Sequence, residues 1–296
     1  MYDFSQLCGI IPPLLTQFTD NDQVDHRAIE RHVDFLVQKG VDALFVCGSN
    51  AEFMTLSIEE RQNLSETVYQ TVNHRIPLIV HITASSLRET LQLASHAAKL
   101  GVEAISLMPP WYYVYDENEI FSWINSVIHS VPDTPILLYN IPQCNGNDLK
   151  PEWIAKWREI HPNIIGVKNS QEDVARIVTY TQWSNFNFLV GSDQLYLYTL
   201  MNGGRGAVSG LANILPEPYT RLRDAYRQGD FAAALQIQQK INVFSQRLHG
   251  ADFSYLKAGL ELRQLGSRQC RAPRKTLDDA TVSSWSKIWA EMEPLR

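Results

Sequence analysis

Ile164-Ile165-Gly166-Val167-Lys168 is an apolar run of strand-forming residues that ends in a lysine. A similar run, Ile136-Leu137-Leu138, leads to Tyr139, which precedes Lys168 by 29 residues, the spacing of one strand–helix–strand step. Burial of an ammonium group without a partner is costly and favours the neutral amine, which is the form that attacks a carbonyl. The two strand ends therefore predict a catalytic pair.

Each side chain also has a simpler interpretation when it is taken alone. A lysine at a strand end commonly extends to solvent, and a tyrosine in a strand is commonly a core residue. The surrounding architecture decides between these interpretations, because in one fold class the strand ends are where the chemistry takes place.

Apolar runs and amphipathic stretches alternate along the chain. Strands are expected at residues 9–18, 43–47, 77–83, 104–108, 136–140, 164–168, 186–191 and 206–209. Helices are expected between them, at residues 27–39, 58–72, 87–100, 119–131 and 174–183. The strands are apolar almost throughout, which is typical of a parallel sheet covered on both faces. This pattern predicts an α/β fold, a (β/α)₈ TIM barrel, and no GxGxxG follows the first strand to favour a dinucleotide-binding sheet.

The pattern changes to helix alone after Pro216. Helices are expected at residues 219–227, 231–248, 253–265 and 277–292, the first of which completes the barrel. No linker rich in glycine, proline or serine separates the rest. We therefore expect a catalytic barrel domain over residues 1–227 and a C-terminal helical region over residues 228–296 that packs on it.

Composition excludes several functional classes. Hydrophobic residues make up 45% of the 296-residue chain, enough for a large core, and the net charge is −6 without a basic block. Nucleic acid and anionic membranes are therefore not expected as partners. No signal peptide or apolar run of membrane-spanning length is evident, and the four cysteines form no CxxC pair, so a cytoplasmic protein with free thiols is expected. The eight histidines show no HxH or HExxH spacing, and neither a metal nor another cofactor is expected.

Four motifs occur in order at the expected strand ends. They are Gly48-Ser49-Asn50-Ala51-Glu52, Tyr139-Asn140-Ile141-Pro142, Gly166-Val167-Lys168, and Gly203-Gly204 with Gly206-Ala207. Together they resemble the dihydrodipicolinate synthase and N-acetylneuraminate lyase family of class I, pyruvate-dependent aldolases, and the resemblance is collinear over essentially the whole chain. Any one motif is weak, whereas four in order are specific.

The resemblance implies a mechanism and an assembly. Lys168 would form a Schiff base with a 2-oxo acid, and Tyr139 would move a proton to and from the substrate hydroxyl. Ser49 would hydrogen-bond to this tyrosine, and Tyr112 would complete the relay from an adjacent subunit, which implies a homotetramer built as a dimer of dimers. The remaining expected substrate-binding residues are Gly48, Asn50, Gly191, Asp193, Val208, Ser209 and Gly210.

Departures from the family pattern bear on the substrate. Cys144 stands where the synthase branch has an arginine that binds the carboxylate of aspartate semialdehyde, and Gln194 stands where the sialic-acid lyase branch has an acid. Asn50 and Ala51 replace the commoner Thr and Gly. The expected reaction is reversible cleavage of a 2-keto-3-deoxy sugar acid into pyruvate and an aldehyde. The alternatives are N-acetylneuraminate lyase, dihydrodipicolinate synthase or keto-deoxy sugar acid dehydratase activity, and a keto-acid-binding pseudoenzyme.

Several other residues suggest structural roles. His81 is expected in the core or lining the site, and Cys47 as a small buried apolar residue. Glu59, Glu60 and Arg61 suggest a solvated helix face.

Overall fold

Eight parallel strands close into a barrel in the computed structural model, which describes residues 6–247 and 252–291. The strands are β1 Gly9–Ile11, β2 Leu44–Val46, β3 Leu78–His81, β4 Ala104–Leu107, β5 Ile136–Asn140, β6 Ile164–Asn169, β7 Asn187–Val190 and β8 Gly206–Val208. Strands β2 to β7 each pair with the next strand in sequence, and β1 pairs with β8. The amide of Phe45 donates to the carbonyl of Pro12 at 3.0 Å and closes the gap between β1 and β2. The expected barrel is confirmed.

The first strand is much shorter than expected. It ends at Ile11 because Pro12 and Pro13 follow, and proline has no N–H to donate to a sheet. Only an isolated bridge, between Pro13 and Phe45, continues the pairing. The expectation of a strand over residues 9–18 is wrong beyond its third residue.

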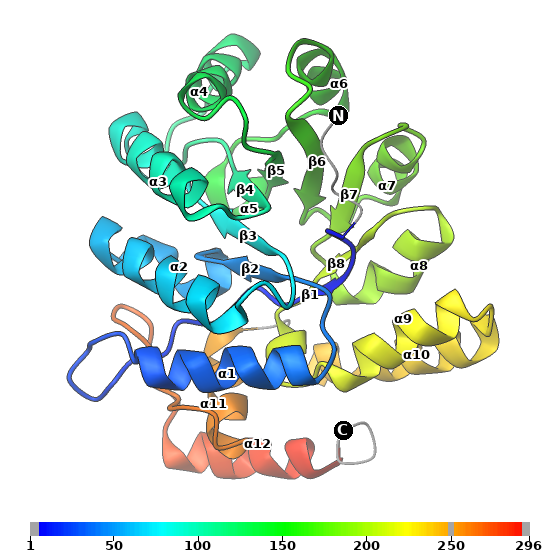
Figure 1. Ribbon diagram of the computed structural model, residues 1–296. Coiled ribbons are helices and arrows are strands. Elements are labelled where there is room, and N and C mark those ends of the chain that lie inside the picture. Colours follow the sequence, from blue (N-terminus) through cyan, green and yellow to red (C-terminus); the bar gives the residue numbers. More distant parts are fainter. Residues whose placement is uncertain (1–5, 248–251, 292–296) are drawn as a thin grey trace.

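Helices surround the strands on the outside of the barrel (Figure 1). They are α1 His26–Gln38, α2 Ile58–Val72, α3 Leu87–Leu100, α4 Glu117–Ser130, α6 Pro151–Ile160, α7 Val174–Thr181, α8 Tyr196–Met201 and α9 Glu217–Arg227, with the short α5 Pro142–Asn145 after β5. Ser57 and Glu60 form a capping box that fixes the start of α2. None of the described helices has the length and apolar character that a membrane span requires.

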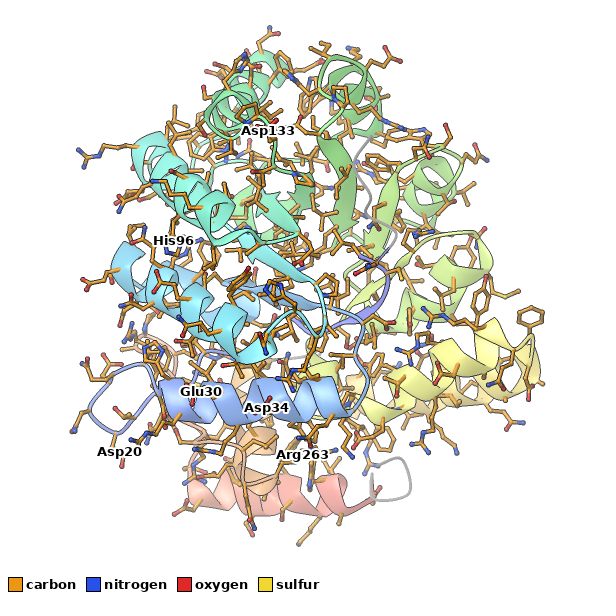
Figure 2. The ribbon with its side chains drawn as sticks, viewed as in Figure 1. Asp20, Glu30, Asp34, His96, Asp133 and Arg263 are labelled. Carbon is orange, nitrogen blue, oxygen red and sulfur yellow. The ribbon has the colours of Figure 1, made fainter. Side chains whose placement is uncertain are left out.

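Three further helices follow the barrel: α10 Phe231–Arg247, α11 Phe253–Leu262 and α12 Asp279–Glu291. Arg263, at the end of α11, lies between α1 and α12 (Figure 2). Its guanidinium group pairs with Glu217 of α9 at 3.1 Å and lies 4.8 Å from the ring centroid of Phe35 in α1. This contact packs the C-terminal helices on the barrel. The division at residues 227 and 228 stays a prediction, and the expected helix ends at Leu248 and Met292 lie outside the described residues.

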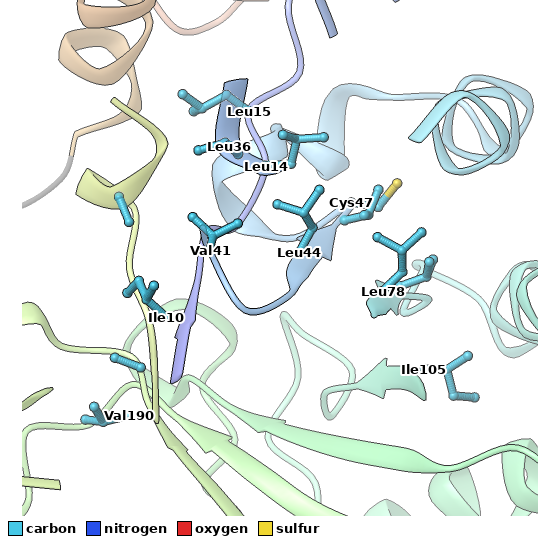
Figure 3. Close-up of a cluster of buried hydrophobic side chains, with 14 of the residues drawn as sticks. Ile10, Leu14, Leu15, Leu36, Val41, Leu44, Cys47, Leu78, Ile105 and Val190 are labelled. Atoms are coloured by element: carbon cyan, nitrogen blue, oxygen red, sulfur yellow. The ribbon is translucent and has the colours of Figure 1, made fainter. Parts of the chain in front are cut away.

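Alternate residues of each strand serve two hydrophobic layers. Ile10, Leu44, Leu78 and Ile105 face the surrounding helices (Figure 3). The barrel interior is filled by a second cluster that includes Ile11, Phe45, Ile79, Leu137, Tyr139, Ile165, Leu189 and Val208. In β5, Leu137 and Tyr139 face the interior because side chains alternate across a strand.

A register shift between β5 and β6 sets the geometry of the site. Ile136 pairs with Ile164, but Leu137 pairs with Gly166, so β6 contains one extra residue at this point. A Cβ atom on Gly166 would lie 2.1 Å from the carbonyl oxygen of Asn187 in β7, and only glycine allows so close an approach. Beyond the shift, Tyr139 pairs with Lys168.

Candidate active site

Lys168 and Tyr139 meet inside the carboxyl end of the barrel. Lys168 Nζ lies 3.9 Å from the centroid of the Tyr139 ring and 4.4 Å from that of Phe45, and the lysine is only 4% exposed. The amine has neither a hydrogen-bond nor an ion-pair partner among the residues that the structure describes. An amine enclosed by ring faces, with no protein acceptor, can react with a carbonyl compound that enters the barrel.

Ser49 is a hydrogen-bond partner of the tyrosine. Its Oγ lies 3.2 Å from the Tyr139 hydroxyl. Ser49 begins the turn η1 Ser49–Ala51, which follows β2 and continues into η2 Phe53–Thr55. Gly48 precedes this turn, and a Cβ atom there would lie 2.7 Å from the Phe45 ring. The structure therefore brings together Ser49, Tyr139 and Lys168, which the sequence placed on three separate strand ends.

His81 completes the wall beside Tyr139. Its ring is buried and lies 5.7 Å from the Tyr139 ring and 5.0 Å from the Phe53 ring, measured between centroids. Burial holds the pKa of His81 well below its usual range, and the positive charges of Arg61 and Lys168 act in the same direction. His81 is therefore a neutral, site-lining residue, as one of the two expectations had it.

Arg61 lies beneath this wall, which corrects an expectation from the sequence. It is 2% exposed, and its Nη1 and Nη2 donate to the carbonyls of Thr83 and His81 at 2.8 and 2.7 Å. The expectation of a solvated helix face is wrong for this residue. The reason is that the backbone at the end of β3 presents these carbonyls toward α2, and the long Arg61 side chain reaches them as a donor.

A cavity of about 510 Å³ opens beside Ser49. Its walls are mainly apolar, and they include Met108, Trp111, Ile141 and Cys144. Arg271 and Arg274, from the segment after α11, line it as well. The sequence did not indicate that the C-terminal region reaches the site, because two arginines in a loop carry no periodic signal.

The expected substrate-binding residues after β7 and β8 lie at the same end of the barrel. Val208, Ser209 and Asp193 are buried, and Gly210 is half-buried. Gly191 packs so closely that a Cβ atom would lie 2.2 Å from the Ser170 hydroxyl oxygen. Burial raises the pKa of the Asp193 carboxyl, and the nearby hydroxyl groups of Ser209, Tyr219 and Ser245 act in the opposite direction. Asn50, after β2, adds a half-buried side chain.

Tyr112 does not join the site of its own chain. It is 86% exposed, its φ is +81°, and its ring contacts that of Tyr113 at 4.9 Å. Within the described part of the chain, no hydrogen bond links it to Ser49 or Tyr139. No group of three or more histidine, cysteine or acidic side chains suited to a metal occurs there either.

A barrel that holds an enclosed lysine against a tyrosine defines a class, the (β/α)₈-barrel aldolases. Comparison with known proteins identifies the family within that class. The chain belongs to the Dihydrodipicolinate synthetase family, whose family model matches residues 6–291. The family named from the four motifs is confirmed.

Named relatives agree with this assignment. The putative 2-dehydro-3-deoxy-D-gluconate aldolase YagE of Escherichia coli is 33% identical over 238 residues, which are 79% of this chain and 78% of that one. The crystal structure of YagE in complex with pyruvate superposes with a TM-score of 0.92 at 30% identity and covers 98% of this chain and 99% of that one. The 4-hydroxy-tetrahydrodipicolinate synthase of Methanopyrus kandleri is 32% identical over 285 residues, 93% of each chain.

A third relative is described as having a catalytic lysine. The structure of a catalytic lysine mutant of the Ruminococcus gnavus sialic acid aldolase matches with a TM-score of 0.92 at 26% identity over 99% of both chains. The relatives are thus aldolases and synthases, and the expectation of a carbon–carbon lyase is confirmed at the level of the family.

Proposed function

We propose that this protein is a class I aldolase that forms a Schiff base between Lys168 and pyruvate. The observation that carries the proposal is the contact of Lys168 Nζ with the Tyr139 ring, next to the hydrogen bond between Tyr139 and Ser49. Retention of both reactive groups in one enclosed site supports catalysis over a binding role, since a sensor of keto acids requires neither an amine nucleophile nor a proton carrier.

The reaction follows from these groups. The amine of Lys168 adds to the C2 carbonyl of the 2-oxo acid and water leaves, which gives a protonated imine. Tyr139 accepts the proton of the C4 hydroxyl as its own phenolic proton passes to Ser49, which releases its hydroxyl proton toward solvent. The C3–C4 bond then breaks, and the electron pair of that bond moves into the imine to give an enamine. The aldehyde departs, C3 takes up a proton, and water releases pyruvate and the free lysine.

Ser49 and the residues at the other strand ends position the substrate. Backbone amides of the turn that begins at Ser49 and Asn50, next to Gly48, bind the carboxylate of the 2-oxo acid. The remaining part of the substrate lies near the ends of β7 and β8, against the substrate-binding residues expected there. These are Gly191, Asp193, Val208, Ser209 and Gly210.

The substrate class is a 2-keto-3-deoxy sugar acid with an uncharged aldehyde portion. Cys144 lines the cavity, and a thiol makes no bidentate contact with a carboxylate. The two cavity arginines are already paired, Arg271 with Glu60 at 2.8 Å and Arg274 with Asp252, which leaves little uncompensated positive charge for a second carboxylate. YagE, named as a 2-dehydro-3-deoxy-D-gluconate aldolase, supports this choice.

The assembly is a homotetramer in which Tyr112 enters the site of an adjacent subunit. Large apolar side chains are exposed at Tyr113 and Val114, next to Tyr112 in the sequence, and at Met54, beside the cavity. Exposed apolar surface of this kind marks contacts between proteins. The left-handed backbone of Tyr112 costs about 1–2 kcal/mol for a residue other than glycine, which an interface would offset.

A cytoplasmic location fits the cysteines. All four are free, and a reducing compartment keeps such thiols free.

Borohydride reduction in the presence of pyruvate tests the central step. We expect a stable three-carbon adduct on Lys168, found by peptide mass mapping, and loss of activity in proportion to labelling. The matched control is Lys168→Met with the same treatment, which should remain unlabelled. An adduct on another lysine, or none on the intact protein, would refute the mechanism.

A further inference from the structure

Lys257 and Glu52 form an ion pair in the interior of the protein. The two side chains are 0% and 2% exposed, respectively. Lys257 comes from α11 in the C-terminal region, and Glu52 comes from the loop after β2 that carries Ser49. Lys257 Nζ also donates to the carbonyl of Gln269 at 2.8 Å and lies 4.3 Å from the centroid of the Phe18 ring. The pair is therefore surrounded by protein groups.

Glu52 is the hinge between the two turns of the loop. Its backbone is left-handed, with φ of 55° and ψ of 35°, a conformation that residues other than glycine adopt only when their surroundings impose it. Its amide donates to the carbonyl of Ser49 at 3.1 Å, and its own carbonyl accepts from the amide of Thr55 at 2.8 Å. The conformation of Glu52 thus sets the direction in which both turns leave it.

Contacts from the C-terminal region hold the Glu52 carboxylate on both oxygens. Oε1 accepts from Lys257 Nζ, and Oε2 accepts from the backbone amide of Arg271 at 3.0 Å. The Arg271 side chain also donates to the carbonyl of Thr55 at 3.0 Å. From the barrel side, the Thr16 hydroxyl donates to the carbonyl of Ala51 at 2.8 Å.

Loss of the contacts to Glu52 would affect Ser49, which lies three residues before it in the same loop. Its hydroxyl lies 3.2 Å from that of Tyr139, a distance at which a small outward movement breaks the hydrogen bond. Removal of one partner from a buried ion pair leaves an uncompensated charge, which draws the loop or water into a new arrangement. The loop that carries Ser49 is the part that such a rearrangement moves.

We propose that Lys257 is a positioning residue, which acts through Glu52 to hold Ser49 against Tyr139 and so makes the C-terminal helices part of the catalytic apparatus. Lys257 itself does not contact Lys168, Tyr139 or Ser49 among the described residues. The inference rests on the proposed function, because it assigns Ser49 a part in that reaction. It extends the catalytic apparatus from the strand ends to α11.

A double-mutant cycle between Lys257 and Ser49 tests the inference. The variants are Lys257→Met, Ser49→Ala and the combination, and the measurements are kcat for pyruvate release and Tm. If Lys257 acts through Ser49, Lys257→Met lowers kcat about tenfold or more in the parent but less than about twofold in the Ser49→Ala background. The same loss in both backgrounds, or unchanged kcat in folded Lys257→Met, would overturn the inference.

Two further variants guard against a folding defect. Combining Lys257→Met with Glu52→Gln removes both charges, which restores stability because no lone charge stays buried, while the contact that holds Ser49 is still lost. This double variant replaces Lys257→Met in the cycle if the single variant does not fold. Lys156→Met removes a lysine from an exposed pair with Glu117 at 3.1 Å and should leave kcat unchanged in both backgrounds.

Borohydride labelling separates the two proposals. A wild-type protein that pyruvate does not label at Lys168 refutes the proposed function, whatever the cycle gives. A wild-type protein that is labelled, together with additive effects of Lys257→Met and Ser49→Ala, refutes only the positioning role.

Discussion

Tyr139 and Lys168 are register partners on adjacent parallel strands, and the lysine amine lies 3.9 Å from the centre of the tyrosine ring. Both side chains face the barrel interior at its carboxyl end. Because strand pairing fixes their separation, neither group depends on a mobile loop for its place in the site. The Tyr139 hydroxyl, hydrogen-bonded to Ser49, can therefore pass protons to and from a substrate that is held covalently on the lysine.

Tyr139→Phe tests the role of the phenol in proton transfer. We expect kcat for aldol cleavage to fall roughly 100-fold or more, since general acid–base catalysis typically contributes that much. Labelling of Lys168 by pyruvate and borohydride should persist at a reduced rate, because the variant keeps the amine and its ring neighbours. Near-normal turnover in this variant would remove Tyr139 from the mechanism.

Mixed subunits test whether Tyr112 acts in a neighbouring site. Tyr112→Phe and Lys168→Met should each be nearly inactive alone. When the two are unfolded and refolded together, sites that combine an intact Lys168 with an intact Tyr112 from the other subunit regain activity, up to about a quarter of the wild-type value for random pairing in a dimer. The control is refolding of each variant by itself. Absence of any recovery in mixed dimers would contradict the shared site.

Cys144→Arg tests the choice of aldehyde. The wild type should prefer glyceraldehyde-type acceptors to aspartate semialdehyde in kcat/KM, each measured with pyruvate. The variant should shift this ratio toward the semialdehyde by about tenfold or more, since a charge-assisted contact contributes on the order of 2 kcal/mol. Cys144→Ser, which adds no charge, is the matched control. A wild type that already prefers the semialdehyde would favour the synthase reaction instead.

His32 predicts a pH dependence of stability. It is fully buried in α1, and burial lowers its pKa from 6.5 to about 4 against a hydrogen bond with the carbonyl of Asn213. The unfolded chain binds a proton at higher pH than the folded protein does. The contribution of neutral His32 to the free energy of unfolding is therefore fully present above pH 6.5. As the pH falls toward 4, the free energy of unfolding decreases by about 3 kcal/mol.

Urea unfolding of His32→Gln between pH 7 and 4 provides the measurement. Glutamine retains a donor for the Asn213 carbonyl but does not titrate, so the variant should lose less stability than the wild type over this range. His74→Gln, at an exposed position, is the control and should follow the wild-type curve. Parallel curves for wild type and His32→Gln would show that His32 does not titrate as stated.

The sequence alone determined the architecture of this protein. The apolar runs placed all eight strands, and the expected bounds of β5, α2 and α3 match the structure residue for residue. Capping boxes occur at Ser57 with Glu60 and at Asp116 with Glu119, and the spacing of these residues in the sequence indicates them. These features depend on local periodicity and on hydrogen bonds within a few residues, which a sequence displays directly.

Contacts between distant segments could not be obtained in this way. Arg61 was expected in solvent, yet it binds carbonyls at and just after the end of β3, and Lys257 pairs with Glu52 across 205 residues. One signal was present: Lys257 is the lone charge in the buried part of α11, and a buried lysine requires a partner. The identity of that partner depends on how the C-terminal helices pack on the barrel.

The register between β5 and β6 is the clearest example of a feature that the tertiary structure decided and the sequence did not show. The sequence placed Tyr139 and Lys168 at the ends of successive strands, but it did not show that they face each other. Ile136 of β5 pairs with Ile164 of β6. Tyr139 lies three residues after Ile136, whereas Lys168 lies four residues after Ile164, so unbroken pairing would set Tyr139 opposite Val167. The extra residue of β6, Ile165, restores the match. Gly166 follows it, where β7 approaches too closely for any side chain. Local periodicity therefore determined the strands, and packing between strands decided which side chains meet, because side chains change face at every residue.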